Sequence, residues 1–283
     1  METSSEEGEQ ATSKIFLPLL LSLLFLACKK TIHEMKPVKV NHVQKTIIDT
    51  IQKTTTALPK KKKKKLYLTF DDGPNKGSSK VLHIAEEEQV PISMFIIGEH
   101  VYASRYQTEV FDSIENSGLV EICNHSYTHA WQNHYEKFYS NPDSAVKDFA
   151  RCADSLHLEN KIVRMPGRNI WRTENTSSTD IKRSASTGDS LESAGYSVIG
   201  WDLEWTYDGK NLELKMDADS ILKEIDTAYA RNLTKYPDHL VFLAHDQVYA
   251  DPNDSAQLHM FIRKLKQKDY ELLTISKYPG ASQ

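Results

Sequence analysis

The sequence predicts an α/β fold, a distorted (β/α) barrel of about seven parallel strands. Past residue 65, short apolar runs alternate with helical stretches, as they do in repeated β/α units. These runs fall short of the eight strands that a complete barrel contains. The chain has 283 residues, 39% of them hydrophobic, which suffices to bury one sizeable core. We therefore expect one main domain over residues 66–283.

The expected elements follow one another in regular order along this domain. Each expected strand is a short apolar run, and helical stretches lie between the strands. Strands are expected at Leu66–Phe70, Ile92–Ile97, Leu119–Cys123, Lys161–Arg164, Ser197–Trp201, Leu240–Ala244 and Glu271–Ile275. Helices are expected at Ser79–Gln89, Ser144–Leu156, Asp217–Ala230 and Ser255–Lys268.

Residues 1–28 are expected to be an export signal. The segment Ile15–Ala27 is nearly all apolar but too short to span a bilayer, and it ends before Cys28 in a lipobox-like pattern. We expect Cys28 to be acylated and to associate the protein with a membrane; a plain secretory signal is the alternative. Residues 1–14 carry four glutamates and one lysine, an unusual start for a signal that points to a translation start further downstream.

The charge of the chain divides sharply. Residues 29–65, the expected linker, hold 12 lysines against two acids, whereas residues 66–283 hold 22 basic and 33 acidic side chains. The run Lys60–Lys65 suits an anionic envelope surface, or it is a solvated linker extended by self-repulsion. We expect an exported protein, lipid-anchored in the bacterial cell envelope or secreted. Nucleic acid is excluded as an expected partner, and no protein partner is predicted.

The two remaining cysteines do not make a disulfide framework. Cys123 and Cys152 form either one bridge or two small buried thiols, and the sequence does not decide between them.

Polar residues follow the expected strands at the point where each strand ends. The carboxyl ends of parallel barrel strands share one face, so residues far apart in sequence should converge there. The residues with this placement are Asp71, Asp72, His125, His129, Arg164, Asp202 and His245.

Several of these residue types can bind a metal and move protons. His125 and His129 lie four apart and can point the same way, and neutral imidazoles are favoured zinc ligands. One aspartate of the Asp71–Asp72 pair would complete a three-ligand site, leaving the other free as a base. His245 could donate a proton near neutral pH. Surface histidines and an ordinary acidic turn are the alternatives.

Five segments together resemble a known family. TFDDGP, NHSYTH, RMPGR, WDLEW and LAH occur in the order and spacing of the motifs of the polysaccharide deacetylase family, carbohydrate esterase family four, also called the NodB-homology domain. The resemblance covers residues 66–275. It implies removal of N-acetyl groups from an N-acetylglucosamine-containing polysaccharide such as peptidoglycan, a chitin-like polymer or poly-N-acetylglucosamine.

The resemblance also implies a role for each matching residue. Asp71 becomes the catalytic base, and Asp72, His125 and His129 become ligands of a divalent metal, with Zn²⁺ preferred and Co²⁺, Ni²⁺ or Mn²⁺ open. His245 becomes the general acid. Arg164 is expected to brace the base, and the family fold has fewer strands than a full barrel.

Two departures from the family pattern bear on these roles. The fourth motif is one residue shorter than usual, which leaves open whether Asp202 or Glu204 orients His245. The third motif has Gly167 and Arg168 where many members place an aromatic residue and glycine. A polar insertion at residues 173–190 follows, and it is expected to be a loop beside the substrate groove.

Residues beside the motifs are candidates for binding the polysaccharide. Exposed aromatics could stack on sugar rings, and Trp205 is favoured among them. The candidates are Trp171, Trp205, Tyr207, Tyr249, Tyr127 and Pro166. Two other functions stay open: an O-acetyl esterase acting on acetylxylan or another polymer, and a carbohydrate-binding relative without catalysis.

Overall fold

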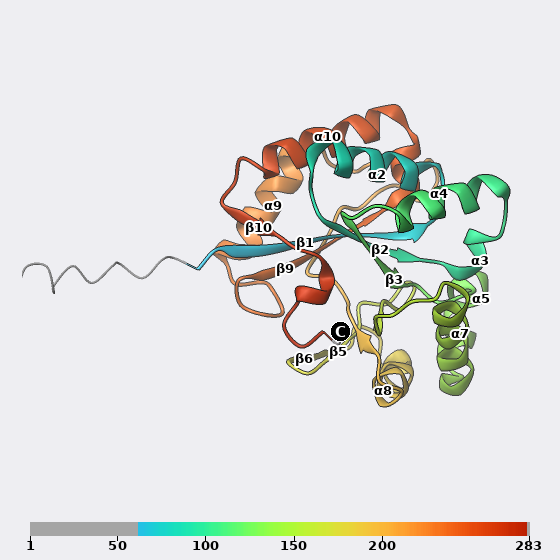
Figure 1. Cartoon of the computed structure of the whole chain (residues 1–283). Coiled ribbons are helices and arrows are strands. Elements are labelled where there is room, and N and C mark those ends of the chain that lie inside the picture. Colours follow the sequence, from blue (N-terminus) through green and yellow to red (C-terminus); the bar gives the residue numbers. More distant parts are fainter. Residues whose placement is uncertain (1–61, 282–283) are drawn as a thin grey trace, which may run out of the picture. The chain divides into compact units, whose positions relative to one another are not determined.

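A curled sheet of ten strands forms an incomplete barrel in the computed structural model, which describes residues 62–281 (Figure 1). The strand order is β6-β5-β7-β4-β3-β2-β1-β9-β8, with β10 paired to β1. The strands are β1 (Lys64–Gly73), β2 (Ile92–Ile96), β3 (Val120–Asn124), β4 (Ile162–Val163), β5 (Trp171–Thr173), β6 (Thr176–Ser178), β7 (Ser197–Val198), β8 (Leu203–Glu204), β9 (His239–His245) and β10 (Tyr270–Leu272).

Helices cover the outside of this sheet. In Figure 1, α2, α4, α9 and α10 lie over the part built from β1, β2 and β9, and α7 and α8 lie at the other end. The helices are α2 (Lys76–Glu88), α3 (Gly98–Val101), α4 (Arg105–Glu115), α5 (His129–Asn133), α6 (Tyr135–Tyr139), α7 (Pro142–Ser155), α8 (Ala185–Ser193), α9 (Ala218–Ala230) and α10 (Pro252–Leu265), with 3₁₀ turns η1 (Lys182–Ser184), η2 (Asp246–Ala250) and η3 (Ile275–Lys277).

Alternation along β1 and β9 divides their side chains between two cores. Leu66, Leu68 and Phe70 pack outward against the helices, whereas Tyr67 packs into the barrel interior with Val241 of β9. Successive side chains of a strand point to opposite faces, so the interior also receives Thr69 and Asp71 from β1. The interior column therefore changes from apolar to polar toward the carboxyl end of the strands.

The expected α/β distorted barrel is confirmed, and all seven expected strands occur. Three strands were not expected: β8, and the antiparallel hairpin of β5 and β6. The expectation of a loop at residues 173–190 is wrong, because this segment contains β6, η1 and the start of α8. Strand β1 also begins at Lys64, inside the expected linker.

The remaining expectations divide between described and undescribed residues. Cys28 and the expected signal lie outside the part of the chain that the structure describes. Within residues 62–281, no helix is long and apolar enough to cross a membrane. Cys123 and Cys152 are both buried free thiols, so the bridge that the sequence left open is not formed.

Candidate metal and acid–base site

A cavity of about 420 Å³ opens at the carboxyl ends of β1, β3 and β9. It gathers residues from all five sequence motifs. Its lining consists of Asp71, Asp72, His125, His129, Asn133, Tyr135, Gly167, Trp201, Glu204, Tyr207, Leu243, His245 and Gln247. The expected convergence on one face of the barrel therefore occurs for most of the predicted residues.

A backbone irregularity places both aspartates in this cavity. In a regular strand, Asp71 and Asp72 would point to opposite faces. The pairing of β1 with β2 instead shifts between Asp71 and Gly73, where Asp71 pairs with Phe95 and Gly73 with Ile96. Asp72 is the extra residue of this bulge and has a φ of 82°. The bulge turns the second carboxylate toward the same cavity as the first.

The two histidines lie on the loop after β3, which buried polar groups hold in place. The backbone N–H of His125 donates to the carbonyl of Ile96 at 2.9 Å, and the side chain of Asn124 accepts from the N–H of Ser126 at 2.8 Å. Asp148 of α7 accepts from the N–H groups of Tyr127 and Thr128. No pattern in the sequence indicates this role for Asp148.

His129 begins an unusual turn. The five residues of α5, His129–Asn133, all have positive φ, so this short helix is left-handed. None of the five is glycine. The left-handed conformation costs roughly 1–2 kcal/mol for each such residue. The Thr128 hydroxyl accepts from the N–H of Trp131 at 3.0 Å, and Ser126 Oγ accepts from the N–H of Ala130 at 3.3 Å. These bonds help to hold His129 beside His125.

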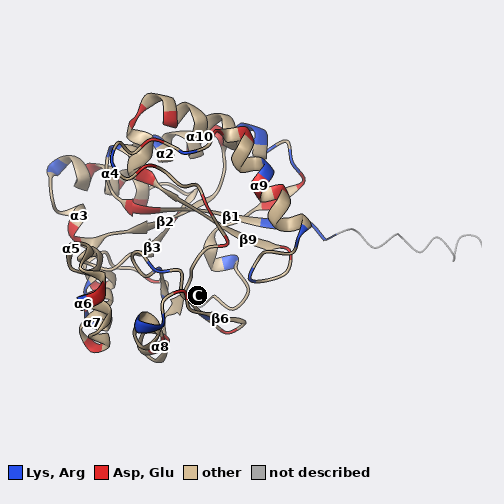
Figure 2. Cartoon of the chain, turned by 180° about the vertical axis from the view of Figure 1, so that it is seen from behind, with Lys and Arg blue, Asp and Glu red and all other residues tan. Residues whose placement is uncertain are grey.

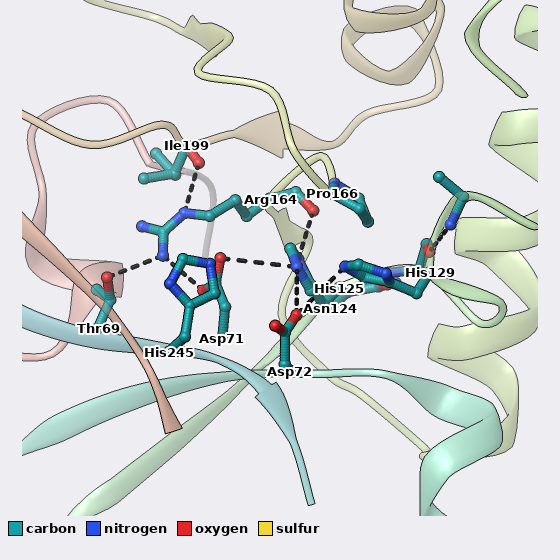
Figure 3. Close-up of polar contacts among 12 residues, drawn as sticks. Thr69, Asp71, Asp72, Asn124, His125, His129, Arg164, Pro166, Ile199 and His245 are labelled. Carbon is teal, nitrogen blue, oxygen red and sulfur yellow. Dashed lines mark hydrogen bonds and ion pairs between the residues drawn. The ribbon is translucent and has the colours of Figure 1, made fainter. Parts of the chain in front are cut away.

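Asp72, His125 and His129 form a compact set of candidate metal ligands (Figure 3). Asp72 Oδ1 lies 3.4 Å from His125 Nε2 and 3.2 Å from His129 Nε2. This oxygen is buried and has no hydrogen-bond partner among the described residues. His125 Nδ1 lies 3.0 Å from the carbonyl of Arg164, to which it can donate, leaving Nε2 as the acceptor. Two ring nitrogens facing one orphaned carboxylate oxygen fit a bound cation.

The second oxygen of Asp72 has its own partner. Gln247 Nε2 donates to Asp72 Oδ2 at 3.0 Å, so the carboxylate is held from the β9 side of the cavity. Burial raises the pKa of Asp72, but the contacts with His125 and His129 together lower it by more. The pKa of Asp72 therefore lies well below its ordinary value. Asp72 is therefore a carboxylate at neutral pH, as a metal ligand must be.

Asp71 is held separately by a buried arginine. Arg164 is fully buried, and its Nη1 donates to Asp71 Oδ1 at 2.7 Å and to Thr69 Oγ1 at 2.8 Å. The same guanidinium donates to the carbonyls of Ile199 and Gly200. Asp71 Oδ2 lies 3.6 Å from His125 Nε2. One oxygen of Asp71 is therefore fixed by Arg164, and the other faces the metal ligands.

His245 lies across the cavity from the metal ligands, at the end of β9. Its Nδ1 is 3.8 Å from Glu204 Oε1, beyond hydrogen-bond distance, and has no other partner within the described chain. The ring packs edge-to-face on Tyr207 with centroids 5.2 Å apart. A movement of well under 1 Å would bring Glu204 into hydrogen-bond range of His245.

Comparisons with known proteins bear on the family of this chain. A model of the polysaccharide deacetylase family matches residues 59–196. The chain belongs to this family. A peptidoglycan-N-acetylglucosamine deacetylase of Bacillus cereus is 27% identical over 224 residues, covering 75% of this chain and 69% of that protein.

Solved structures show the same fold. A CE4 esterase from Streptococcus mutans matches with a TM-score of 0.57 at 18% identity, covering 80% of this chain and 90% of that chain. A polysaccharide deacetylase from Bacillus cereus matches with a TM-score of 0.52 at 23% identity, covering 76% and 94% of the two chains.

The family-model match includes the first three motifs and ends before β7. The placement of His245 and Glu204 in this polysaccharide deacetylase relative therefore rests on the geometry just described. Asp202, the alternative partner of His245, does not reach it. Its two oxygens accept from the backbone N–H groups of Lys235 and Val241, at 2.6 and 2.8 Å, and Val241 lies four residues before His245 on β9. The expectation of a catalytic role for Asp202 is corrected to a structural one.

Asp246 links the end of β9 to the start of α2 next to the site. Asp246, directly after His245, is fully buried and accepts hydrogen bonds from Asn75 and Ser78 at the start of α2. Burial raises the pKa of Asp246 to about 8. These bonds tie the end of β9 to the turn that follows Asp72. The sequence did not reveal this link, because its two sides lie about 170 positions apart.

The expectation that Trp205, Tyr249 and Trp171 are exposed is wrong. All three are fully buried. Trp205 packs on the rings of Phe242, Tyr249 and Phe261, and its indole N–H donates to the carbonyl of Met216. None of these three rings can stack on a sugar without the core opening. Tyr207, another aromatic candidate, does line the cavity.

Tyr127 and Pro166 are also absent from the cavity lining. The Tyr127 ring lies under the guanidinium of Arg151, 3.6 Å from its carbon, on the side of α7. Pro166 is buried, and its carbonyl accepts from the hydroxyl of Tyr139 at 2.7 Å. Their expected contact with substrate is corrected accordingly.

Six lining residues were not among the predicted site residues: Asn133, Tyr135, Gly167, Trp201, Leu243 and Gln247. Gln247 follows His245 by two positions, which is the one local signal that could have suggested it. Tyr135 and Asn133 reach the cavity only through the left-handed turn, which nothing in the sequence marks.

Proposed function

We propose that this protein is a metal-dependent hydrolase that removes N-acetyl groups from an N-acetylglucosamine-containing polysaccharide. The observation that carries the proposal is the single cavity shared by the ligand set Asp72–His125–His129, the Arg164-held Asp71 and His245. The family membership and the Bacillus cereus relative support the substrate class.

Asp72, His125 and His129 would hold the divalent metal, and zinc suits two imidazoles and one carboxylate. When bound, the metal supplies Lewis-acid chemistry, making water more acidic and polarising the acetyl carbonyl. With three protein ligands, the set leaves coordination positions for water and substrate.

Asp71 is proposed to take the proton from the attacking water. Arg164 orients its carboxylate through the hydrogen bond from Nη1 to Oδ1. Oδ1 is engaged by Arg164, so Oδ2 is the oxygen that receives the proton. This division lets Asp71 act as a base without being drawn into the ligand set.

His245 is proposed to hand a proton to the nitrogen that leaves with the sugar. Its ring stands at the cavity wall opposite the ligand set, and Glu204 approaches Nδ1. A carboxylate that accepts from Nδ1–H would fix the orientation of the ring and leave Nε2–H free to donate. Products would be acetate and a glucosamine unit.

Acetate release tests this proposal. The metal-reconstituted protein should release acetate from N-acetylglucosamine oligomers, lose the activity with a chelator and recover it with zinc. Asp71→Asn protein serves as the control for contaminating activity. Acetylxylan in the same panel tests the O-acetyl esterase alternative. Carbohydrate binding without acetate release from any polymer would contradict the proposal and favour a binding relative.

We also propose that the protein is exported and anchored through an acylated Cys28. The apolar segment at residues 15–27 and the lysines of residues 29–65 support this placement. Metabolic labelling with a fatty acid should mark the wild type. A Cys28→Ser protein that is labelled equally would contradict the proposal.

A further inference from the structure

A second cavity, of about 560 Å³, opens beside the metal cavity and is mainly basic. Arg168, Arg183 and Lys137 line it, and Glu136 is the one acidic residue in its lining. The two cavities are neighbours along the chain, since Gly167 lines the first and Arg168 the second. A substituent on the sugar unit next to the one that carries the scissile acetyl group could therefore reach the basic cavity.

Arg168 is held so that part of its guanidinium remains available. Nε donates to the buried Ser184 Oγ at 2.9 Å, and Nη1 donates to the carbonyl of Gly167 at 2.7 Å. The guanidinium lies 5.2 Å from the ring centroids of both Tyr135 and Tyr139. Nη2 has no hydrogen-bond partner among residues 62–281. A stacked, pre-oriented arginine with a free edge is well suited to bind an anion.

Tyr135 connects this arginine to the metal ligands. The guanidinium of Arg168 lies 5.2 Å from the centroid of the Tyr135 ring. The same ring packs edge-to-face against His129, with centroids 6.1 Å apart. Tyr135 lines the metal cavity but not the basic one. It therefore forms part of the wall between the two, within reach of a sugar that spans them.

The acids near Arg168 do not neutralise the cavity. Glu136 pairs with Arg183, but both side chains are more than two thirds exposed, and such pairs contribute little. Asp180 is engaged by the backbone N–H groups of Asn169 and Ile181. This cavity is mainly basic, although the domain holds 22 basic and 33 acidic residues, whose positions along the chain are coloured in Figure 2.

We propose that the basic cavity is a subsite for a carboxylate on the polysaccharide, carried by a sugar unit next to the one that loses its acetyl group. The inference rests on the proposed function and narrows its substrate to an acidic N-acetylated glycan. A planar carboxylate matches the two-pronged donor geometry of arginine. Arg183 and Lys137, on flexible exposed stems, would add long-range attraction.

Matched substrates test the subsite. Deacetylation would be measured on glycan strands that alternate N-acetylglucosamine with an ether-linked carboxylate sugar, on the same strands after reduction of the carboxyl group, and on oligomers alternating N-acetylglucosamine with a uronic acid. Comparison of the first and third substrates distinguishes the two sources of carboxylate. The variants are Arg168→Gln and Arg183→Gln, with Lys182→Gln as control, because Lys182 is exposed and does not line the cavity.

The wild type should show a kcat/KM on the order of tenfold higher for at least one carboxylate substrate than for its reduced form, a ratio of the size expected for one charged contact. Arg168→Gln should bring that ratio close to one, mainly through KM, and Arg183→Gln should lower it less. Lys182→Gln should keep the wild-type ratio. The melting temperature of each variant shows whether it has folded.

A wild-type ratio of one, with acetate released from both substrate forms, would overturn the subsite and leave the proposed function standing. Absence of acetate release from all substrates would instead contradict the proposed function. Calorimetric binding of the carboxylate oligomer to Asp71→Asn protein tests the subsite without turnover. The affinity should fall with added salt and with Arg168→Gln, and equal affinity for the reduced oligomer would overturn the proposal.

Discussion

Asp71 and His245 occupy the same register position on two neighbouring parallel strands, β1 and β9. Below them, Thr69 pairs with Leu243 and Tyr67 with Val241, so the two candidate proton-transfer residues stand at the top of one interior column. Their separation is therefore set by the spacing of two hydrogen-bonded strands. A rigid sheet of this kind keeps a base and an acid apart while both face one cavity.

The Asp71→Asn variant should keep its metal and lose acetate release by on the order of a hundredfold or more, the scale of removing a general base. The amide cannot accept the proton, but the ligand atoms of Asp72, His125 and His129 are unchanged. Metal content by elemental analysis and initial rates check both parts. Loss of metal in this variant would contradict the separation of roles between the two aspartates.

Asp72→Asn and His125→Ala should each reduce the bound metal well below one ion per chain, because each removes one of three ligands. His134→Ala is the matched control: His134 is exposed, follows the same turn and is not in the ligand set. Equilibrium dialysis with zinc measures the difference. Full metal content in both ligand variants would disprove the assigned site.

Glu204→Gln and Asp202→Asn should behave differently. Glu204→Gln removes the carboxylate that lies 3.8 Å from His245 Nδ1 and should lower kcat, because the imidazole ring loses the group that could orient it. Asp202→Asn replaces one of two oxygens that accept backbone N–H groups, and it should lower the melting temperature instead. An unchanged kcat in Glu204→Gln would remove Glu204 from the mechanism.

His239 should make the fold sensitive to acid. Burial, followed by the charge of Lys65, lowers its pKa to about 4 in the folded state, and Tyr67 bonds its Nδ1 at 2.7 Å. The ordinary histidine pKa is about 6.5, so the unfolded chain gains the proton first. The stability that depends on neutral His239 is complete above pH 6.5 and is lost as the pH falls toward 4. The total loss is up to about 3 kcal/mol.

Denaturant titrations at pH 7.5 and 4.5 measure this effect, with metal removed from both samples. His239→Gln cannot titrate, so its stability should change less between these pH values than that of the wild type. The exposed His157 provides the control, as His157→Asn. An equal acid response in His239→Gln and wild type would rule out His239 as the cause.

Gly77→Ala should destabilise the domain strongly. A Cβ at Gly77 would lie 1.7 Å from the backbone oxygen of Asp246, so α2 and η2 would have to separate. A Cβ at Gly118 would meet no atom within 4 Å, so Gly118→Ala is the control. We expect a loss of several kcal/mol for Gly77→Ala and little change for Gly118→Ala, measured by denaturant unfolding. Equal stability of the two variants would contradict the described packing.

The ligand residues could be predicted from the sequence because each follows an apolar run, and parallel strands bring such positions together. The buried supports could not. Asp148 and Asp246 bond groups on other elements, and nothing local distinguishes them from exposed acids. Trp205 is the last residue of the fourth motif but packs against Phe261 of α10, a contact that depends on tertiary packing.

The hairpin of β5 and β6 was missed for a related reason. Its residues are mostly polar, and Arg172 is satisfied there by Asp189 and by the carbonyls of Trp171 and Ser178. A search for apolar runs passes over strands held mainly by hydrogen bonds. The left-handed turn after Thr128 escaped prediction because it contains no glycine.

The bulge at Asp72 sets a condition for anyone who wishes to transplant this chemistry. Copying the two aspartates onto a regular strand of another scaffold would send one carboxylate into the cavity and the other into the hydrophobic layer behind it. The smallest portable unit is therefore the pair of aspartates together with their irregular backbone and the partner strand that tolerates it. In a designed enzyme, backbone shape would have to be specified before the ligands are chosen.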